Sequence, residues 1–216
     1  MTARSWTIVL ALAVLLLMAS PGFAQGTSAT QQLQEAAQEI TSILDQCAKK
    51  NDFNEDCQEQ IVEVADRRFD WKEMAKRSLA RAWRDRTPQE QEEFTRLFRE
   101  LLKSTYIKKI ASYGGEKVVF EGERIEGKYA MVESSIILPR ENRKVPVSYR
   151  LLQQGDRWLI YDVVIEGVSL VNNYRSQFND ILQTSSFDEL LKKIEKRISD
   201  EKATSPAPGA VPKKEL

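Results

Sequence analysis

The sequence predicts an α+β fold in which about six helices cover a curved, four-stranded antiparallel sheet. Apolar residues recur every three or four positions over residues 33–106 and again over residues 170–198. Between these two regions, residues 117–166 alternate with a period of two, which is typical of strands. The elements therefore occur in the order helices, strand meander, helices. This order is typical of a fold in which helices lie against one face of an antiparallel sheet. Such a layered arrangement can enclose an apolar cavity.

The first 24 residues have the pattern of a secretory signal peptide. Arg4 supplies a positive start, residues 6–18 form a compact apolar run, and small residues suit cleavage after Ala24. A retained membrane anchor is the alternative, but the run is shorter than the ~20 residues of a spanning helix. We therefore expect export, with residues 25–202 forming one α+β domain. Residues 203–216 are a Pro/Ala-rich tail that we expect to be disordered.

The composition argues against several classes of function. The chain has 32 basic and 32 acidic residues, so its net charge does not favour nucleic acid as a partner. It has no histidine, which removes Ser-His triads and His-containing zinc sites. We expect no enzyme, no metal and no cofactor. An enzyme using carboxylate or lysine chemistry is a weaker alternative, because no residue spacing favours it.

Cys47 and Cys57 are the only cysteines in the chain. They lie at the facing ends of two predicted helices, Leu33–Lys49 and Cys57–Arg67. Export takes them to an oxidising compartment, so we expect a disulfide across the intervening turn. Closing so short a loop contributes roughly 2–3 kcal/mol to stability in the chain-entropy model. Two free thiols packed between the helices are the alternative.

Two more helices precede the predicted sheet. An apolar stripe predicts a helix from Trp71 to Trp83. The residues Thr87-Pro88-Gln89-Glu90 form a capping box that opens the next helix. Gly114–Gly115 marks the end of that helix.

The predicted sheet is followed by two C-terminal helices. Pro146 indicates that its strand is an edge strand or contains a bulge. Beyond the sheet, Ser169 or Asn172 begins one helix, and Phe187–Ile198 form the last. The four strands, joined by short connections, are Lys117–Ile125, Lys128–Leu138, Val145–Gln153 and Arg157–Glu166.

Asp162 is unusual because it interrupts an otherwise apolar strand, and Tyr174 and Arg175 follow it shortly in the sequence. Two interpretations remain open. Tyr174 and Arg175 lie at the mouth of a pocket, where the guanidinium meets a phosphate, or Asp162 and Arg175 form a structural ion pair. A basic patch and a solvated helix face are likewise both open for Arg77, Arg81, Arg84 and Arg86.

Two segments resemble the MlaC family, also called toluene-tolerance auxiliary proteins. The first is FDWKEMAKRSLARAWRDRTPQEQEEFTRLFRELLKSTYIKKIASY, and the second is WLIYDVVIEGVSLVNNYRSQF. The resemblance covers about Leu33–Ile198. The chain departs from the family at Leu79-Ala80, where Leu-Gly is frequent, and in its Cys47/Cys57 pair. The residues that match are Trp83, Phe94, Phe98, Tyr106, Tyr161, Asp162, Val163, Gly167, Ser169, Tyr174, Arg175 and Phe178.

This resemblance implies a soluble periplasmic carrier that shuttles glycerophospholipids, with their tails held between sheet and helices. The implied partners are an inner-membrane ABC transporter with MCE-domain subunits and an outer-membrane lipoprotein complex. We expect a monomer whose only bound molecule is the phospholipid cargo. The alternative is an exported, lipid-free interaction module whose interior is filled by its own side chains. From the apolar strand faces and the resemblance, we predict that Arg175 lies near the headgroup and that the tails contact Tyr106, Tyr149, Val163, Ile165, Val168 and Tyr174.

Overall fold

The computed structural model describes residues 28–50, 53–111, 115–139 and 142–203. The predicted signal peptide and residues 204–216 of the predicted tail lie outside this part. The described residues form six α-helices, one 3-10 helix and five strands. In chain order these are α2 (Ala29–Lys50), α3 (Glu55–Arg68), α4 (Trp71–Leu79), η1 (Ala80–Asp85), α5 (Pro88–Ala111), β1 (Lys117–Glu126), β2 (Tyr129–Leu138), β3 (Arg143–Gln154), β4 (Arg157–Ile165), β5 (Val168–Ser169), α6 (Leu170–Leu182) and α7 (Phe187–Ala203).

The sheet is antiparallel throughout, with the strand order β1-β2-β3-β4-β5. The α+β class is confirmed, but the prediction of four strands is wrong because β5 adds a fifth. Glu166 and Gly167 both have positive φ angles, of 49° and 81°, and form a tight turn after β4. The chain then pairs Val168 with Ile165 before it enters α6. Two residues are too few to leave a detectable alternation in the sequence.

Pro146 lies in an interior strand, so the prediction of an edge is wrong. β3 pairs with both β2 and β4, and the irregularity between β3 and β4 falls at Arg150/Leu151 instead. The carbonyl of Pro146 accepts a hydrogen bond from the Glu166 N–H, at 3.0 Å. The nitrogen and carbonyl of one strand residue face the same neighbour. The missing N–H of Pro146 therefore falls at the end of the β3–β4 ladder, where it costs little.

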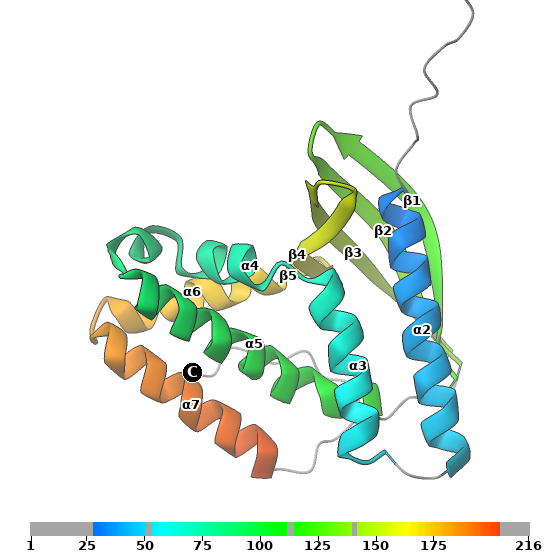
Figure 1. The fold of residues 1–216 in the computed structure, drawn as a ribbon, viewed down its shortest axis with the longest axis horizontal. Helices are drawn as coiled ribbons and strands as arrows, with labels where there is room; N and C mark the ends of the chain where they lie inside the picture. Colours follow the sequence, from blue (N-terminus) through cyan, green and yellow to red (C-terminus); the bar gives the residue numbers. More distant parts are fainter. Residues whose placement is uncertain (1–27, 51–52, 112–114, 140–141, 204–216) are drawn as a thin grey trace, which may run out of the picture.

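Figure 1 shows α2 lying across one face of the sheet with α3 beside it, while α4–α7 form a helical bundle next to the β4–β5 edge. The apolar core is divided accordingly. The bundle cluster is filled by aromatic rings: Phe178 is fully buried and lies 5.5 Å from Phe94 and 5.8 Å from Phe98, measured between ring centroids. The sheet cluster consists of buried residues from the sheet, the start of α2 and the start of α6. Its members are Ala29, Leu33, Ala130, Val132, Val145, Val147, Leu151, Trp158, Ile160, Val163 and Leu170.

Local signals in the sequence set several of the helix ends. The Glu90 N–H bonds to Thr87 Oγ1 at 3.2 Å and the Thr87 N–H bonds to Glu90 Oε2 at 2.7 Å, which confirms the capping box. Ser169, rather than Asn172, caps α6 through its hydroxyl. The helix α5 ends at Ala111, and Gly114 of its predicted end lies outside the described residues. The predicted Cys47–Cys57 disulfide is present and links the end of α2 to the start of α3.

The predicted Trp71–Trp83 helix is divided at Ala80, where α4 gives way to η1. Ala80 has a φ of 51° and a ψ of −115°, which is a conformation that favours glycine. The position matches the departure from the Leu-Gly pattern of the family. The alanine methyl group therefore imposes a local backbone strain on the junction.

Replacing Ala80 with glycine should stabilise the protein. We expect Ala80→Gly to raise the free energy of unfolding by about 1 kcal/mol, because glycine adopts positive φ without a steric penalty. Ala82→Gly in η1 is the matched control and should lower it by about 0.5–1 kcal/mol. Urea unfolding of both variants measures these effects. An Ala80→Gly variant that is less stable than the wild type would contradict the strain at this junction.

Candidate functional site

The face of the sheet that α2 covers is largely apolar. The register places Val132, Tyr149 and Val163 in one row across β2, β3 and β4. Directly opposed residues of an antiparallel sheet share a face, and because side chains alternate along each strand, every second row extends the same surface. We call this surface the inner face. The half-buried apolar residues that pack against the sheet cluster include Tyr106, Phe120, Ile136, Leu138, Tyr149 and Ile165.

A bulge in β1 brings a carboxylate to the inner face. The register shifts between Phe120 and Gly122, so that Phe120 pairs with Ser134 but Glu123 pairs with Val132. Glu123 Oε1 accepts a hydrogen bond from the Thr30 N–H at 2.8 Å. A negative charge at the N-terminus of a helix is favourable. The bulge thereby fixes the first turn of α2 to the sheet.

Gln32 makes a second attachment between α2 and the sheet. It is buried, donates from Nε2 to the Asp156 carbonyl at 3.0 Å, and accepts from the Trp158 N–H at 3.1 Å. Both partners belong to the turn and strand at the start of β4. Sequence reasoning did not identify Gln32 or Glu123, because a single polar residue beside an apolar stripe carries no signal of its distant partner.

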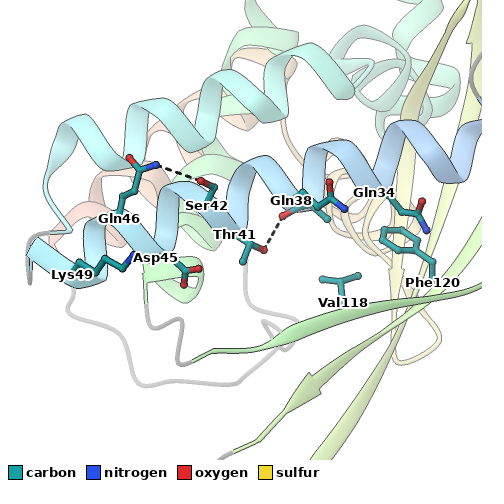
Figure 2. A pocket seen from close by; sticks show the side chains of 10 residues that line it. Gln34, Gln38, Thr41, Ser42, Asp45, Gln46, Lys49, Val118 and Phe120 are labelled. Atoms are coloured by element: carbon teal, nitrogen blue, oxygen red, sulfur yellow. Dashed lines mark hydrogen bonds between the residues drawn. The ribbon is translucent and has the colours of Figure 1, made fainter.

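Further along α2, an open groove of about 670 Å³ separates the helix from β1 (Figure 2). The side chains of Val118 and Phe120 point toward α2 from the strand. The helix wall is mostly polar, and Thr41 and Gln46 bond to neighbouring residues of the same helix. One apolar wall and one polar wall suit an amphiphilic ligand. The helix wall consists of Gln34, Ala37, Gln38, Thr41, Ser42, Asp45, Gln46 and Lys49.

The half-buried residues of the inner face continue this groove along the sheet. Val118 pairs with Ile136, which in turn pairs with Val145. Phe120 lies in the next row, with Ser134, and this row ends at Ile165. An apolar strip therefore runs from the open β1 edge towards β4.

The predicted site residues divide into two groups. Tyr149, Val163 and Ile165 lie on the inner face, and Tyr106 of α5 contacts both the sheet cluster and the bundle cluster. Tyr174 is buried in the bundle cluster, 5.3 Å from the Phe98 ring centroid.

Val168 and Arg175 are both exposed, in β5 and α6. Val168 lies in β5, which pairs with β4, and Arg175 lies in the helix that follows β5, whereas the groove opens beside β1 at the other edge of the sheet. The groove instead carries Asp45 and Lys49. Sequence reasoning did not assign Asp45 or Lys49 to the site, because the polar face on which they lie looks like the solvated face of any amphipathic helix.

Asp162 does not pair with Arg175. Its carboxylate lies 3.0 Å from Arg150 Nη1, accepts from the Ser169 hydroxyl at 2.7 Å, and accepts from the Val171 N–H at 3.1 Å. Arg150 is directly opposite Asp162 in the β3–β4 register, whereas Arg175 lies on the exposed side of α6. The predicted ion pair is therefore wrong. The buried Asp162 carboxylate instead fixes the turn from β4 through β5 into α6.

Two of the four arginines considered as a basic patch have local partners. Arg77 forms an ion pair with Glu73 at 2.8 Å and lies 4.1 Å above the Tyr161 ring. Arg86 forms an ion pair with Glu90 at 3.3 Å, and its guanidinium lies above Phe187. Arg77 and Arg86 are therefore engaged in contacts that hold neighbouring elements together, and this does not favour a basic patch.

Burial raises the pKa of the Tyr106, Tyr149 and Tyr174 phenols above the ordinary value of 10.0. The nearby Tyr174 raises the pKa of Tyr106 further, and the Ser134 hydroxyl partly opposes the rise for Tyr149. Near neutral pH all three side chains are uncharged. They therefore present no negative charge that would repel an anionic group.

Neither a metal-binding cluster nor a membrane-spanning helix is found among the described residues. No group of three or more His, Cys, Asp or Glu side chains is placed to hold a metal ion. None of the helices in the same part combines the length and apolar composition that crossing a membrane requires.

A family profile for the MlaC protein matches residues 34–196, well over half of the chain. The chain belongs to the MlaC family. The resemblance drawn from the two sequence segments is thereby confirmed. Membership is consistent with the fold, since the matched range runs from the start of α2 into α7 of this MlaC-family protein.

Two relatives are similar to this MlaC-family protein. One, from Haemophilus influenzae, is named an intermembrane phospholipid transport system binding protein and is 22% identical over 125 residues. That match covers 56% of this chain and 58% of the relative, less than two thirds of its length. The other is the structure of a phospholipid-binding protein from Ralstonia solanacearum in complex with a phospholipid. It is 22% identical, with a TM-score of 0.72, and the match covers 79% of this chain and 97% of the other. This second likeness shows the fold.

The buried phenols make stability depend on pH in the alkaline range. Below about pH 10 they are protonated in both the folded and the unfolded protein. Above it the unfolded chain releases these protons while the folded protein retains them, so the free energy of unfolding should fall as pH rises. Urea unfolding between about pH 8 and pH 11 measures this fall. Tyr106→Phe should flatten it, whereas Tyr129→Phe, which changes an exposed ring, should leave it unchanged. An equal fall in all three proteins would contradict the burial of Tyr106.

Proposed function

We propose that this MlaC-family protein is a soluble periplasmic phospholipid carrier. The acyl chains lie along the inner face of the sheet, and the groove between α2 and β1 is their entrance. The observation that carries this proposal is the continuity of an open, two-sided groove with a strip of half-buried apolar side chains. The shared fold with a protein solved in complex with a phospholipid supports it.

The energetics of lipid transfer explain why a carrier is needed. A two-tailed phospholipid has on the order of thirty methylenes, and each costs about 0.8 kcal/mol to expose to water. Releasing both tails therefore costs more than roughly 20 kcal/mol, so unassisted crossing of an aqueous compartment is negligible. A groove of about 670 Å³ falls within the size range of small-molecule sites.

We infer that Tyr106, Tyr149, Val163 and Ile165 contact the tails. The first two combine an apolar ring with an uncharged hydroxyl, which tolerates both chain and ester groups. For Tyr174 and Val168 the proposed contact requires movement of the bundle or of the β5 turn, because one is enclosed by rings and the other faces solvent. Arg175 and Lys49 are competing candidates for the headgroup phosphate.

The proposed partners are an inner-membrane ABC transporter with MCE-domain subunits and an outer-membrane lipoprotein complex. The name of the Haemophilus relative, which refers to intermembrane phospholipid transport, supports this assignment. A carrier shifts lipid only according to its affinities for the states that it visits. The direction of transfer is therefore a property of the partners, and the carrier itself needs no nucleotide.

Charge placed on the groove side of β1 should weaken lipid uptake. We expect Phe120→Glu and Val118→Glu to weaken uptake of a fluorescent phospholipid from vesicles by at least about tenfold, because an unpaired carboxylate against an acyl chain costs more than about 1.4 kcal/mol. Val119→Glu is the matched control, since Val119 lies between them, points to the opposite face and is 46% exposed. Circular dichroism checks that all three variants fold. Equal uptake by Phe120→Glu and Val119→Glu would exclude this entrance.

Two charge deletions separate the headgroup assignments. If the phosphate lies in the groove, Lys49→Gln should weaken the binding of phosphatidylglycerol taken up from vesicles by roughly two- to fivefold, as expected for an exposed charge contact. Arg175→Gln should then have no effect. The reverse pattern would place the headgroup at α6, as the sequence predicted. Lipid extraction and mass spectrometry of the loaded variants provide the measurement.

A further inference from the structure

We propose that the Cys47–Cys57 disulfide is a positioning element of the groove. It holds the C-terminal half of α2 at the distance from β1 at which a bound lipid is retained. This inference rests on the proposed function for its lipid readout, whereas its geometric part concerns only the placement of α2.

Among the described residues, the hydrogen bonds from α2 to the sheet come from the N-terminal end of the helix. Thr30 bonds to Glu123 of β1, and Gln32 bonds to Asp156 and Trp158. Both contacts lie in the first turn of a helix of 22 residues. From Gln34 onward, the side of α2 nearest β1 lines the open groove instead.

The C-terminal half of α2 is held by α3 and α5. Leu44 and Cys57 belong to a small buried cluster with Ile61 of α3 and Ile107 of α5. The disulfide is the covalent connection within this cluster. The groove and the cluster thus occupy two sides of the same helical turns, since Asp45 and Lys49 line the groove while Leu44 packs inward.

Helix α3 connects this cluster back to the sheet. The Asp70 N–H, just after α3, bonds to the Ile160 carbonyl at 2.8 Å, and Arg157 donates to the Arg67 carbonyl at 2.5 Å. The C-terminal end of α3 is therefore fixed to β4, and its N-terminal end carries Cys57. The disulfide completes a frame that runs from the sheet through α3 to the far end of α2.

The remaining ties between α2 and α3 are weak by comparison. Arg67 forms an ion pair with Glu39 at 2.5 Å, with about half of each side chain exposed, and Arg68 forms one with Glu35 at 3.4 Å. Exposed ion pairs contribute little. Both pairs also involve the N-terminal half of α2. Without the disulfide, the far half of α2 depends on the small buried cluster, so we infer that the groove widens and loses its lipid sooner.

The test compares lipid release from the wild type, from a Cys47→Ser/Cys57→Ser double variant and from Arg67→Gln, all as mature chains. Each protein is loaded with a fluorescent phosphatidylethanolamine and mixed with acceptor vesicles. We expect release from the double variant to be several-fold faster, and release from Arg67→Gln, which loses only an exposed ion pair, to match the wild type. Reversible reduction of the folded wild-type protein provides the same comparison if the double variant does not fold.

A second measurement needs no lipid and reports the position of α2 relative to β1 directly. Spin labels carried on noncanonical amino acids at positions 50 and 117 report the distance between the end of α2 and the start of β1. We expect a narrow distribution in the wild type and a broader, longer one without the disulfide. If the wild type takes up no lipid, the proposed function fails and this distance alone decides the inference. An unchanged distance distribution, or an unchanged release rate alongside a lower thermal stability, would overturn it.

Discussion

In the described part of the chain, helix α2 is hydrogen-bonded to the sheet through its N-terminal end, and the shape of the groove depends on this constraint. Glu123 and Gln32 fix the first turn of the helix to the inner face. Buried contacts of Leu33 then cover part of that face. Beyond them the helix is held from α3 and α5 rather than from the sheet, which leaves the groove beside Val118 and Phe120. A helix packed along its whole length would close this groove.

The separation of the core into clusters explains how the protein combines stability with an uncovered apolar strip. Phe94, Phe98 and Phe178 pack ring against ring at the centre of the bundle and are fully buried there. Asp162 joins this bundle to the sheet by fixing the start of α6. The inner face can then keep half-buried residues such as Tyr149 and Ile165, whose remaining exposed surface is available to the acyl chain of the proposed cargo.

Much of the fold follows from local patterns in the sequence. The period-two segments became strands, the Thr87–Glu90 capping box opened α5, and the spacing of Cys47 and Cys57 predicted their disulfide. The errors arise where tertiary context decides. The strand β5 exists because the Glu166–Gly167 turn folds two residues back onto β4. The edge indicated by Pro146 is instead the end of an interior ladder.

The site was harder to predict than the fold for the same reason. Alternation along β3 and β4 placed Tyr149, Val163 and Ile165 on a common face. No local pattern shows which edge of the sheet stays open, so sequence reasoning proposed Arg175 for the headgroup and did not consider Lys49, which lines the groove. The bulge beside Phe120 also reverses which β1 residues face inward, and a pattern of alternating residues does not reveal such a reversal.

The most direct test of the central claim is native mass spectrometry of the mature protein, purified from periplasm without detergent, with its extracted lipids identified in parallel. We expect a discrete added mass equal to one or two phospholipids, and we expect this mass to be lost in Phe120→Glu but kept in Val119→Glu. A purely ligand-free protein that also takes no lipid from vesicles would contradict the carrier and favour a lipid-free interaction module.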